Sequence, residues 1–230
     1  EPELAEEIIP NSDATEWTFK IRKGVEFHDG KTLTADDVIY SMNRHLGADS
    51  VSNANALVGM IKEWKKVNDY EVKAVLSSPN ADLPIALGTF HFKIIKEGTT
   101  DFSTAIGTGP YKCKEFKPGV RTIGVRNENF WDEGGYLDEI EHFGIGDPTA
   151  RLNAFLAGDV DAMVNLPPKA IPQVETAPGK EVWSVESGAY INIACRMDMP
   201  QSGNLDLILA MKNLMDRQRL VKGVYKGQAS

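Results

Sequence analysis

Apolar and polar side chains alternate near the start of the chain, where polar residues separate Trp17, Phe19 and Ile21. A period of two predicts a half-buried β-strand at this point. Thr34 follows at the position of a helix N-cap, and Asp37 stands three residues later, where it completes a capping box. The segment therefore predicts a strand, a stretch of turns and then a helix that begins after Thr34.

The middle of the chain has the pattern of two β-hairpins. Residues 62–76 alternate on either side of an Asn-Asp turn pair, and residues 111–126 do so around a Pro-Gly pair. Residues 82–88 predict a short helix between the hairpins, because their proline is tolerated only in a first helical turn. Residues 137–145 alternate again and predict a further strand.

A capped helix is the clearest feature of the second half. Asp147 is a good N-cap, Pro148 suits the first helical position, and Gly158 is placed to end the helix in a left-handed conformation. The pattern that follows predicts further elements, in chain order: a strand over 160–164, a short helix over 167–176, strands within 181–194, and a helix over 205–221.

Composition places the chain among ordinary globular proteins. Of its 230 residues 42% are hydrophobic and 25% charged, and the net charge is −8. The nearest approach to a basic block is 62–66, which reads as a strand edge, so we expect no nucleic-acid partner. No apolar run approaches the roughly 20 residues that a membrane helix needs. Because residues 1–7 are acidic and not those of an export signal, we expect a mature or truncated chain.

The cysteines and aromatic residues are assigned to packing. Cys113 and Cys195 lie in no metal-binding spacing, and we expect two buried free thiols, although the sequence leaves open whether they pair. Large aromatic side chains dominate cores, so we expect structural roles for Trp17, Phe27, Trp64, Trp131 and Tyr111.

Enzymatic chemistry finds little support in the residues. Gly144 and Gly146 resemble a dinucleotide fingerprint, but Thr149 stands where a small residue is needed and Pro148 removes an N–H that would bind phosphate. The four histidines have no metal-ligand spacing, and the carboxylate pairs lack a partner acid or base. We therefore expect no catalytic residues, no metal and no cofactor.

Four sequence blocks, in order, resemble the bacterial extracellular solute-binding proteins of family 5, which serve peptide, dipeptide and nickel ABC importers. The blocks are Trp17-Thr-Phe-Lys-Ile-Arg-Lys-Gly-Val-Glu-Phe-His-Asp-Gly30 with the helix after it, Gly107-Thr-Gly-Pro-Tyr-Lys112 with Arg126-Asn-Glu-Asn-Phe-Trp131, the helix from Asp147 to Asp161, and Ala210-Met-Lys-Asn-Leu-Met-Asp-Arg217. Members of the family are considerably longer, so we expect this chain to be a fragment that lacks sequence at both ends.

The resemblance implies an α/β fold of the periplasmic binding protein type, with mixed sheets and flanking helices, as an incomplete two-lobed receptor. We expect an α/β subdomain over 1–106, a partial core of the first lobe over 107–200, and a hinge with the start of the second lobe over 201–230. Phe90, His91, Phe92, Asn192 and Arg196 align with cleft-lining stretches, although an ordinary amphipathic strand would equally explain residues 90–92.

The implied function is the capture of di- or oligopeptides for a membrane permease and its ATPase, by a monomeric receptor in the periplasm or a lipoprotein on a Gram-positive cell surface. Nickel chelates, opines or oligosaccharides as ligands, and a sensor role without transport, remain alternatives. Without the second lobe we expect residues 1–230 to bind ligand weakly or not at all.

Overall fold

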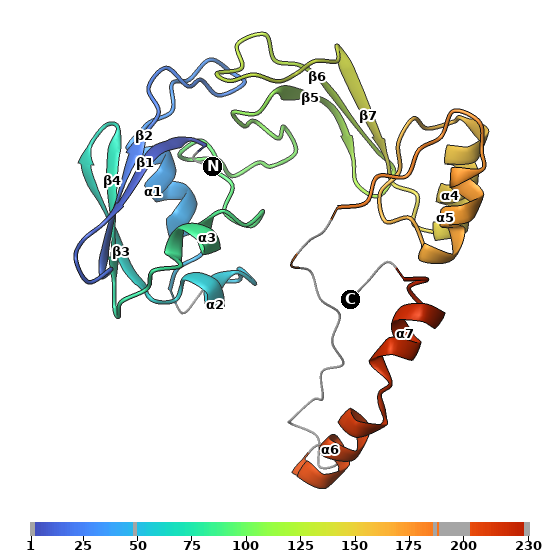
Figure 1. Cartoon of the computed structure of the whole chain (residues 1–230). Coiled ribbons are helices and arrows are strands. Elements are labelled where there is room, and N and C mark those ends of the chain that lie inside the picture. Colours follow the sequence, from blue (N-terminus) through green and yellow to red (C-terminus); the bar gives the residue numbers. More distant parts are fainter. Residues whose placement is uncertain (1–2, 48–49, 186–187, 189–202, 228–230) are drawn as a thin grey trace. The chain divides into compact units, whose positions relative to one another are not determined.

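The computed structural model describes residues 3–47, 50–185, 188 and 203–227 (Figure 1). The chain divides into two compact units, Glu1–Gly144 and Ile145–Ser230. The finer division into subdomains at 106 and 200 stays a prediction.

A four-stranded antiparallel sheet organises the first part of unit 1. Its strands are β1 (Ala5–Pro10), β2 (Glu16–Ile21), β3 (Ile61–Asn68) and β4 (Glu71–Leu76), in the order β1-β2-β4-β3. The predicted strand and the first hairpin are confirmed, whereas β1 was not predicted. Along β2 and β4 every second side chain is buried, so one face of the sheet supplies the core.

Helix α1 (Ala35–Asn43) lies against this sheet (Figure 1) and begins with the predicted capping box, in which Thr34 and Asp37 satisfy each other's backbone donors. The main hydrophobic core is shared by the sheet, α1 and the loops between them. Its buried members include Trp17, Phe19, Ile21, Val25, Phe27, Leu33, Met42, Trp64, Val72 and Phe92. Trp131 packs against this core while partly buried, which agrees with the structural role expected of the aromatic residues.

Two short helices flank the first hairpin in the sequence, α2 (Asn55–Val58) before it and α3 (Leu83–Leu87) after it. A second antiparallel sheet comprises β5 (Tyr111–Lys117), β6 (Arg121–Arg126) and β7 (Glu139–Phe143), in that order. The second hairpin and the strand after it are thus confirmed. Close packing fixes a glycine at the end of β7, because a Cβ atom on Gly144 would lie 2.5 Å from the carbonyl oxygen of Gly119.

Unit 2 begins with α4 (Pro148–Ala157), which is capped as the sequence predicts. The Asp147 carboxylate accepts a hydrogen bond from Ala150 N–H at 2.7 Å, and Gly158 ends the helix at φ 85°. The predicted short helix is confirmed as a 3₁₀ turn (Pro168–Ala170) that leads into α5 (Ile171–Glu175). A small core joins these elements through Leu152, Phe155, Ala170 and Val174.

Two predictions for unit 2 are wrong. Residues 160–164 form bends and not a strand, because no described strand of this unit pairs with them and two of their side chains, Val160 and Met163, pack against the small helical core. The single helix over 205–221 is instead two helices, α6 (Leu205–Leu214) and α7 (Arg217–Gly223). Asp216 separates the helices, since its carboxylate caps α7 by accepting a hydrogen bond from Arg219 N–H at 2.9 Å. Among the strands predicted within 181–194, residues 181–185 have no regular structure and most others lie outside the described residues.

Cys113 on β5 is half-buried and not fully buried, and Cys195 lies outside the described residues, so whether the two cysteines pair stays open. None of the helices in the described ranges is long and apolar enough to cross a membrane.

Candidate ligand-binding site

The predicted site residues 90–92 form a turn after α3, and the expected alternative of an amphipathic strand is wrong for them. Gly88 is the C-cap of α3 and makes the last helical hydrogen bond, from its N–H to Pro84 O at 3.0 Å, and Thr89 then continues the turn. Its hydroxyl donates to Ala86 O, and its carbonyl accepts from Phe92 N–H at 3.2 Å. These local bonds use the donors and acceptors that a strand would need for a ladder.

The turn separates its three aromatic residues. Phe90 is 75% exposed, and its ring stacks against that of the exposed His91 at a centroid distance of 3.9 Å. Phe92 is only 5% exposed and packs in the main core, with the His45 ring edge-on at 4.9 Å. Phe90 and His91 therefore present aromatic faces to solvent, whereas Phe92 anchors the turn from beneath.

His45 lies half-buried beneath this turn. Burial lowers the pKa of His45 below its ordinary value, and the charges of Arg44 and His91 lower it further. Its Nδ1 lies 2.7 Å from the Ser52 hydroxyl. A neutral ring is favoured here, which suits a residue that packs against Phe92.

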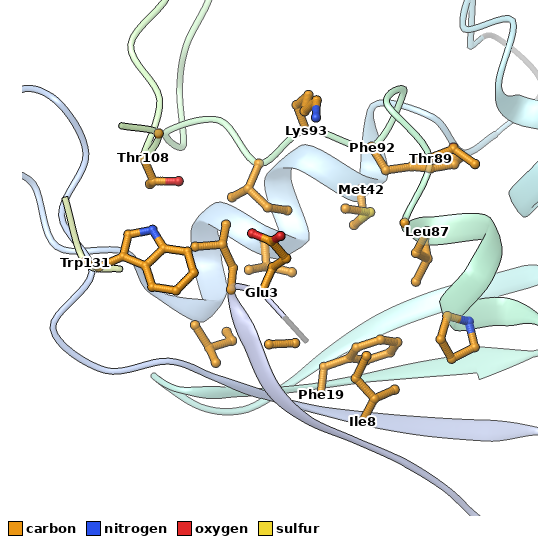
Figure 2. Close-up of a pocket in the computed structure, with 18 of the residues that line it drawn as sticks. Glu3, Ile8, Phe19, Met42, Leu87, Thr89, Phe92, Lys93, Thr108 and Trp131 are labelled. Carbon is orange, nitrogen blue, oxygen red and sulfur yellow. The ribbon is translucent and has the colours of Figure 1, made fainter. Parts of the chain in front are cut away.

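Beside the turn, unit 1 contains an apolar cavity of about 570 Å³ (Figure 2). The sheet contributes Ile8, Phe19 and Trp64 to its wall, and α1 contributes Met42. Other parts of the wall come from the end of α3, the segment 92–94, and the loops that carry Thr108 and Trp131. Of these wall segments, only the one at Phe92 was singled out from the sequence. The loops that carry Thr108 and Trp131 were not, since only the tertiary fold brings them to the cavity.

The loop at Gly107–Pro110 is held at the cavity by two side chains. His28 Nδ1 accepts a hydrogen bond from Gly107 N–H at 3.2 Å, and His28 Nε2 donates to Gly109 O at 3.0 Å. The Asn127 amide nitrogen donates to the same carbonyl at 3.1 Å. This pattern requires the neutral imidazole that carries its proton on Nε2. The second of the four sequence blocks thus folds into a cavity wall.

Asp37 holds the segment at Glu97 against the start of α1. Its side chain is fully buried and accepts hydrogen bonds from Thr34 N–H at 2.9 Å and from Glu97 N–H at 2.8 Å, and it forms an ion pair with Lys31. Burial raises the pKa of the Asp37 carboxyl, but the bonds from Glu97, Lys31 and Thr34 outweigh that effect, and the pKa lies below its ordinary value. One turn along α1, the Ser41 hydroxyl accepts from Ile95 N–H at 2.8 Å. Through these two side chains, α1 therefore binds the backbone N–H groups of Ile95 and Glu97.

Unmatched polar groups are few around the cavity. Among buried side-chain atoms of the described residues, Trp64 Nε1 and Arg151 Nε have no hydrogen-bond partner, and Trp64 lines the cavity. The same part of the chain holds no cluster of three or more His, Cys, Asp or Glu residues that could bind a metal. The arrangement suits apolar contact. Asn192 and Arg196, the other predicted site residues, lie outside the described residues.

Comparison with known proteins identifies the family to which the chain belongs. A family model described as bacterial extracellular solute-binding proteins, family 5 Middle, matches residues 1–230. The fold agrees with it: the oligopeptide-binding protein AppA of Bacillus subtilis, solved with a nonapeptide, superposes with a TM-score of 0.80 at 25% identity, over 98% of this chain and 47% of that one. The chain therefore belongs to family 5 of the bacterial extracellular solute-binding proteins, with a fold of the periplasmic binding protein type.

Two further matches give the range of relatives. In the sequence comparison, AppA of B. subtilis is 28% identical over 236 residues, which is 97% of this chain and 43% of AppA. The binding protein AgaA of A. tumefaciens R10, solved with agropinic acid, has a TM-score of 0.71 at 27% identity, over 77% of this chain and 37% of that one. The chain thus spans about half the length of these relatives or less, in accord with the prediction of a fragment. Both relatives are described as binding proteins.

Proposed function

We propose that the protein is the substrate-binding component of an ABC importer, which captures di- or oligopeptides between two lobes and delivers them to a membrane permease and its ATPase. The observation that carries this proposal is the family match along the whole of residues 1–230, with an oligopeptide-binding protein among the relatives. The receptor acts as a monomer in the periplasm, or as a lipoprotein on a Gram-positive cell surface. It performs no covalent chemistry.

The exposed pair of Phe90 and His91 is proposed to contact the captured peptide. Its stacked rings offer a rigid apolar surface with a polar edge, which can bind a peptide backbone or a side chain at small cost in conformational entropy. Phe92 supports this surface from the core. Asn192 and Arg196 are proposed to bind polar groups of the same ligand.

An opine is the second candidate ligand. AgaA, which was solved with agropinic acid, matches this chain at an identity similar to that of AppA. Nickel chelates, oligosaccharides and a sensor role without transport remain alternatives within the same fold. Direct binding of nickel is disfavoured, because the described residues supply no cluster of metal ligands.

Titration calorimetry on the receptor expressed from its complete reading frame tests the proposal. Pools of di- to nonapeptides, agropinic acid and nickel–histidine are each titrated into the ligand-free protein. We expect saturable binding of peptides, which Phe90→Ala weakens about tenfold, the loss of one aromatic contact. Phe116→Ala, the removal of a half-exposed ring on β5, serves as the control and leaves affinity unchanged. Binding of agropinic acid with no response to any peptide would overturn the peptide assignment.

A further inference from the structure

The apolar cavity of unit 1 is open to solvent, and its most buried side chains belong to the main core. These include Phe19, Met42, Trp64 and Phe92, each less than a tenth exposed. The volume of about 570 Å³ lies within the range of about 300–1,000 Å³ that is usual for ligand pockets. The cavity therefore offers solutes a ready apolar surface on a packed support.

The cavity borders the turn that is proposed to contact the captured peptide. Gly88, Thr89 and Phe92 line it, and Phe90 and His91 lie between them in the same turn. Figure 2 shows Thr89 and Phe92 together at one side of the cavity. Each residue of an extended peptide spans about 3.3–3.6 Å, close to the spacing of successive residues in the turn. A peptide that contacts the exposed rings thus has its neighbouring residues within reach of the cavity.

From this continuity we infer that the cavity is a specificity pocket, which takes one large apolar side chain, aromatic or branched aliphatic, of the captured peptide. The inference rests on the proposed function, because it assigns a preference to the same peptide ligand. The side chain enters between α3 and the loop at Gly107–Pro110, from which Leu87 and Thr108 line the cavity on opposite sides (Figure 2).

The chemistry of the wall selects an apolar side chain. Its charged residues, Glu3 and Lys93, are themselves exposed, and the Thr89 hydroxyl already donates to Ala86 O. The buried part of the wall carries no charge among the described residues, so a charged side chain would lose its hydration there without an ion-pair partner. An apolar side chain instead gains free energy with the area that it removes from water.

The pocket is also prepared for its occupant before binding. His28 and Asn127 both donate to Gly109 O and hold the loop at Gly107–Pro110, and the core residues of the wall are fixed by their packing. Binding to such a pocket orders few groups, so little of the gain from burial is lost.

Calorimetry on the complete receptor with a matched set of peptides tests the pocket. Penta-alanine is compared with variants that carry Phe, Leu or Lys at one position in turn. We expect Phe and Leu at one position to bind about tenfold more tightly than Ala or more, and Lys to give no gain, as for a hydrophobic pocket. Equal affinities for the four side chains at every position, or a preference for Lys, would overturn the inference.

A variant that fills the cavity assigns the preference to this site. Thr108→Phe occupies part of the space into which the Thr108 side chain points in Figure 2, so we expect the preference for Phe over Ala to fall to near unity. Thr100→Phe is the control and keeps the preference, because Thr100 is exposed and does not line the cavity. A preference that survives in Thr108→Phe would place the selective contact elsewhere.

A second variant keeps the inference falsifiable if Thr108→Phe does not fold. Leu87→Glu places a carboxylate in the wall, and we expect the affinity for the Lys-bearing peptide to rise relative to the wild type, a gain that unfolding cannot produce. Ile85→Glu is the matched control on α3, since Ile85 is exposed and does not line the cavity. The same change in both variants, or none in either, would contradict the pocket.

Failure of the pocket and failure of the proposed function give different results. If peptides from the mixed pools bind but the penta-alanine set shows no preference or no binding, the peptide assignment stands and the pocket is refuted. If no peptide of either kind binds, the peptide assignment itself fails, and the pocket fails with it.

Discussion

Asp37 is the residue on which three segments of unit 1 converge. Asp37→Asn keeps its shape but removes the charge that accepts bonds from Thr34, Lys31 and the backbone at Glu97. We expect the free energy of unfolding to fall by about 2–3 kcal/mol, the range for charged hydrogen bonds at a buried site. Urea denaturation measures the change. Asp36→Asn is the matched control, since the Asp36–Lys66 pair is exposed and should contribute far less. Equal effects for the two variants would refute the special role of Asp37.

The depressed pKa values of Asp37 and His45 predict how stability depends on pH. For each group the unfolded state binds the proton more tightly, so its contribution is complete above the unfolded pKa and is lost as pH falls toward the folded one. Stability should therefore decline in two stages, first below about 6.5, the ordinary value for histidine, and again below about 3.9, that of aspartate. Denaturation midpoints measured across this range check both stages. If His45→Phe left the first decline unchanged, another group would be responsible.

His28 positions the loop that carries Thr108. His28→Ala removes an acceptor from Gly107 N–H and a donor from Gly109 O, so we expect the Gly107 amide to exchange with solvent about tenfold faster or more, because local opening becomes easier. Hydrogen exchange read by NMR gives the local effect, with global stability lowered by about 1–3 kcal/mol. His142→Ala, on an exposed position of β7, is the control. Unchanged exchange at Gly107 would show that Asn127 alone holds the loop.

At the scale of elements, α4 depends on its two ends. Asp147→Ala removes the bond to Ala150 N–H, and we expect unit 2 to lose about 1 kcal/mol of stability, as is usual for an N-cap. Thermal denaturation followed by circular dichroism measures this loss. Asp159→Ala, just beyond the C-terminal end of the helix, carries the same change of charge without a cap and should be neutral or slightly stabilising. A larger loss from Asp159→Ala than from Asp147→Ala would contradict the capping role.

The elements that the sequence predicted correctly are those with local determinants. The capping box at Thr34, the cap at Asp147 and the left-handed Gly158 each act within one helical turn, so a single segment contains the whole signal. Strand β1 has no such signal. It carries Glu6 and Glu7 and ends at Pro10, and only pairing with β2 makes it an edge strand.

The failed predictions depended on distant parts of the chain. The residues at 160–164 alternate like a strand, but Val160 and Met163 pack on the small core of unit 2 and the segment has no described partner strand. The cavity was not predicted for the same reason, because it too depends on distant parts of the chain. Its wall contains residues that lie far apart in the sequence, such as Ile8, Thr108 and Trp131, and no local pattern predicts that their segments come together. The resemblance to the family singled out Phe90, His91 and Phe92, whose role as a site stays a prediction, whereas the rest of the cavity wall required the structure.

For the whole molecule, the proposed function requires that the ligand favour one arrangement of the receptor. A peptide held between two lobes contacts both only when they are closed, so binding energy shifts the population toward the closed state. We expect small-angle X-ray scattering of the complete receptor to give a smaller radius of gyration at saturating peptide. At a concentration of 100 times Kd the peptide should also stabilise the protein by about 2.7 kcal/mol. Stabilisation without compaction would show a binding site that does not close, and the receptor would then lack the signal by which occupancy is presented to a permease.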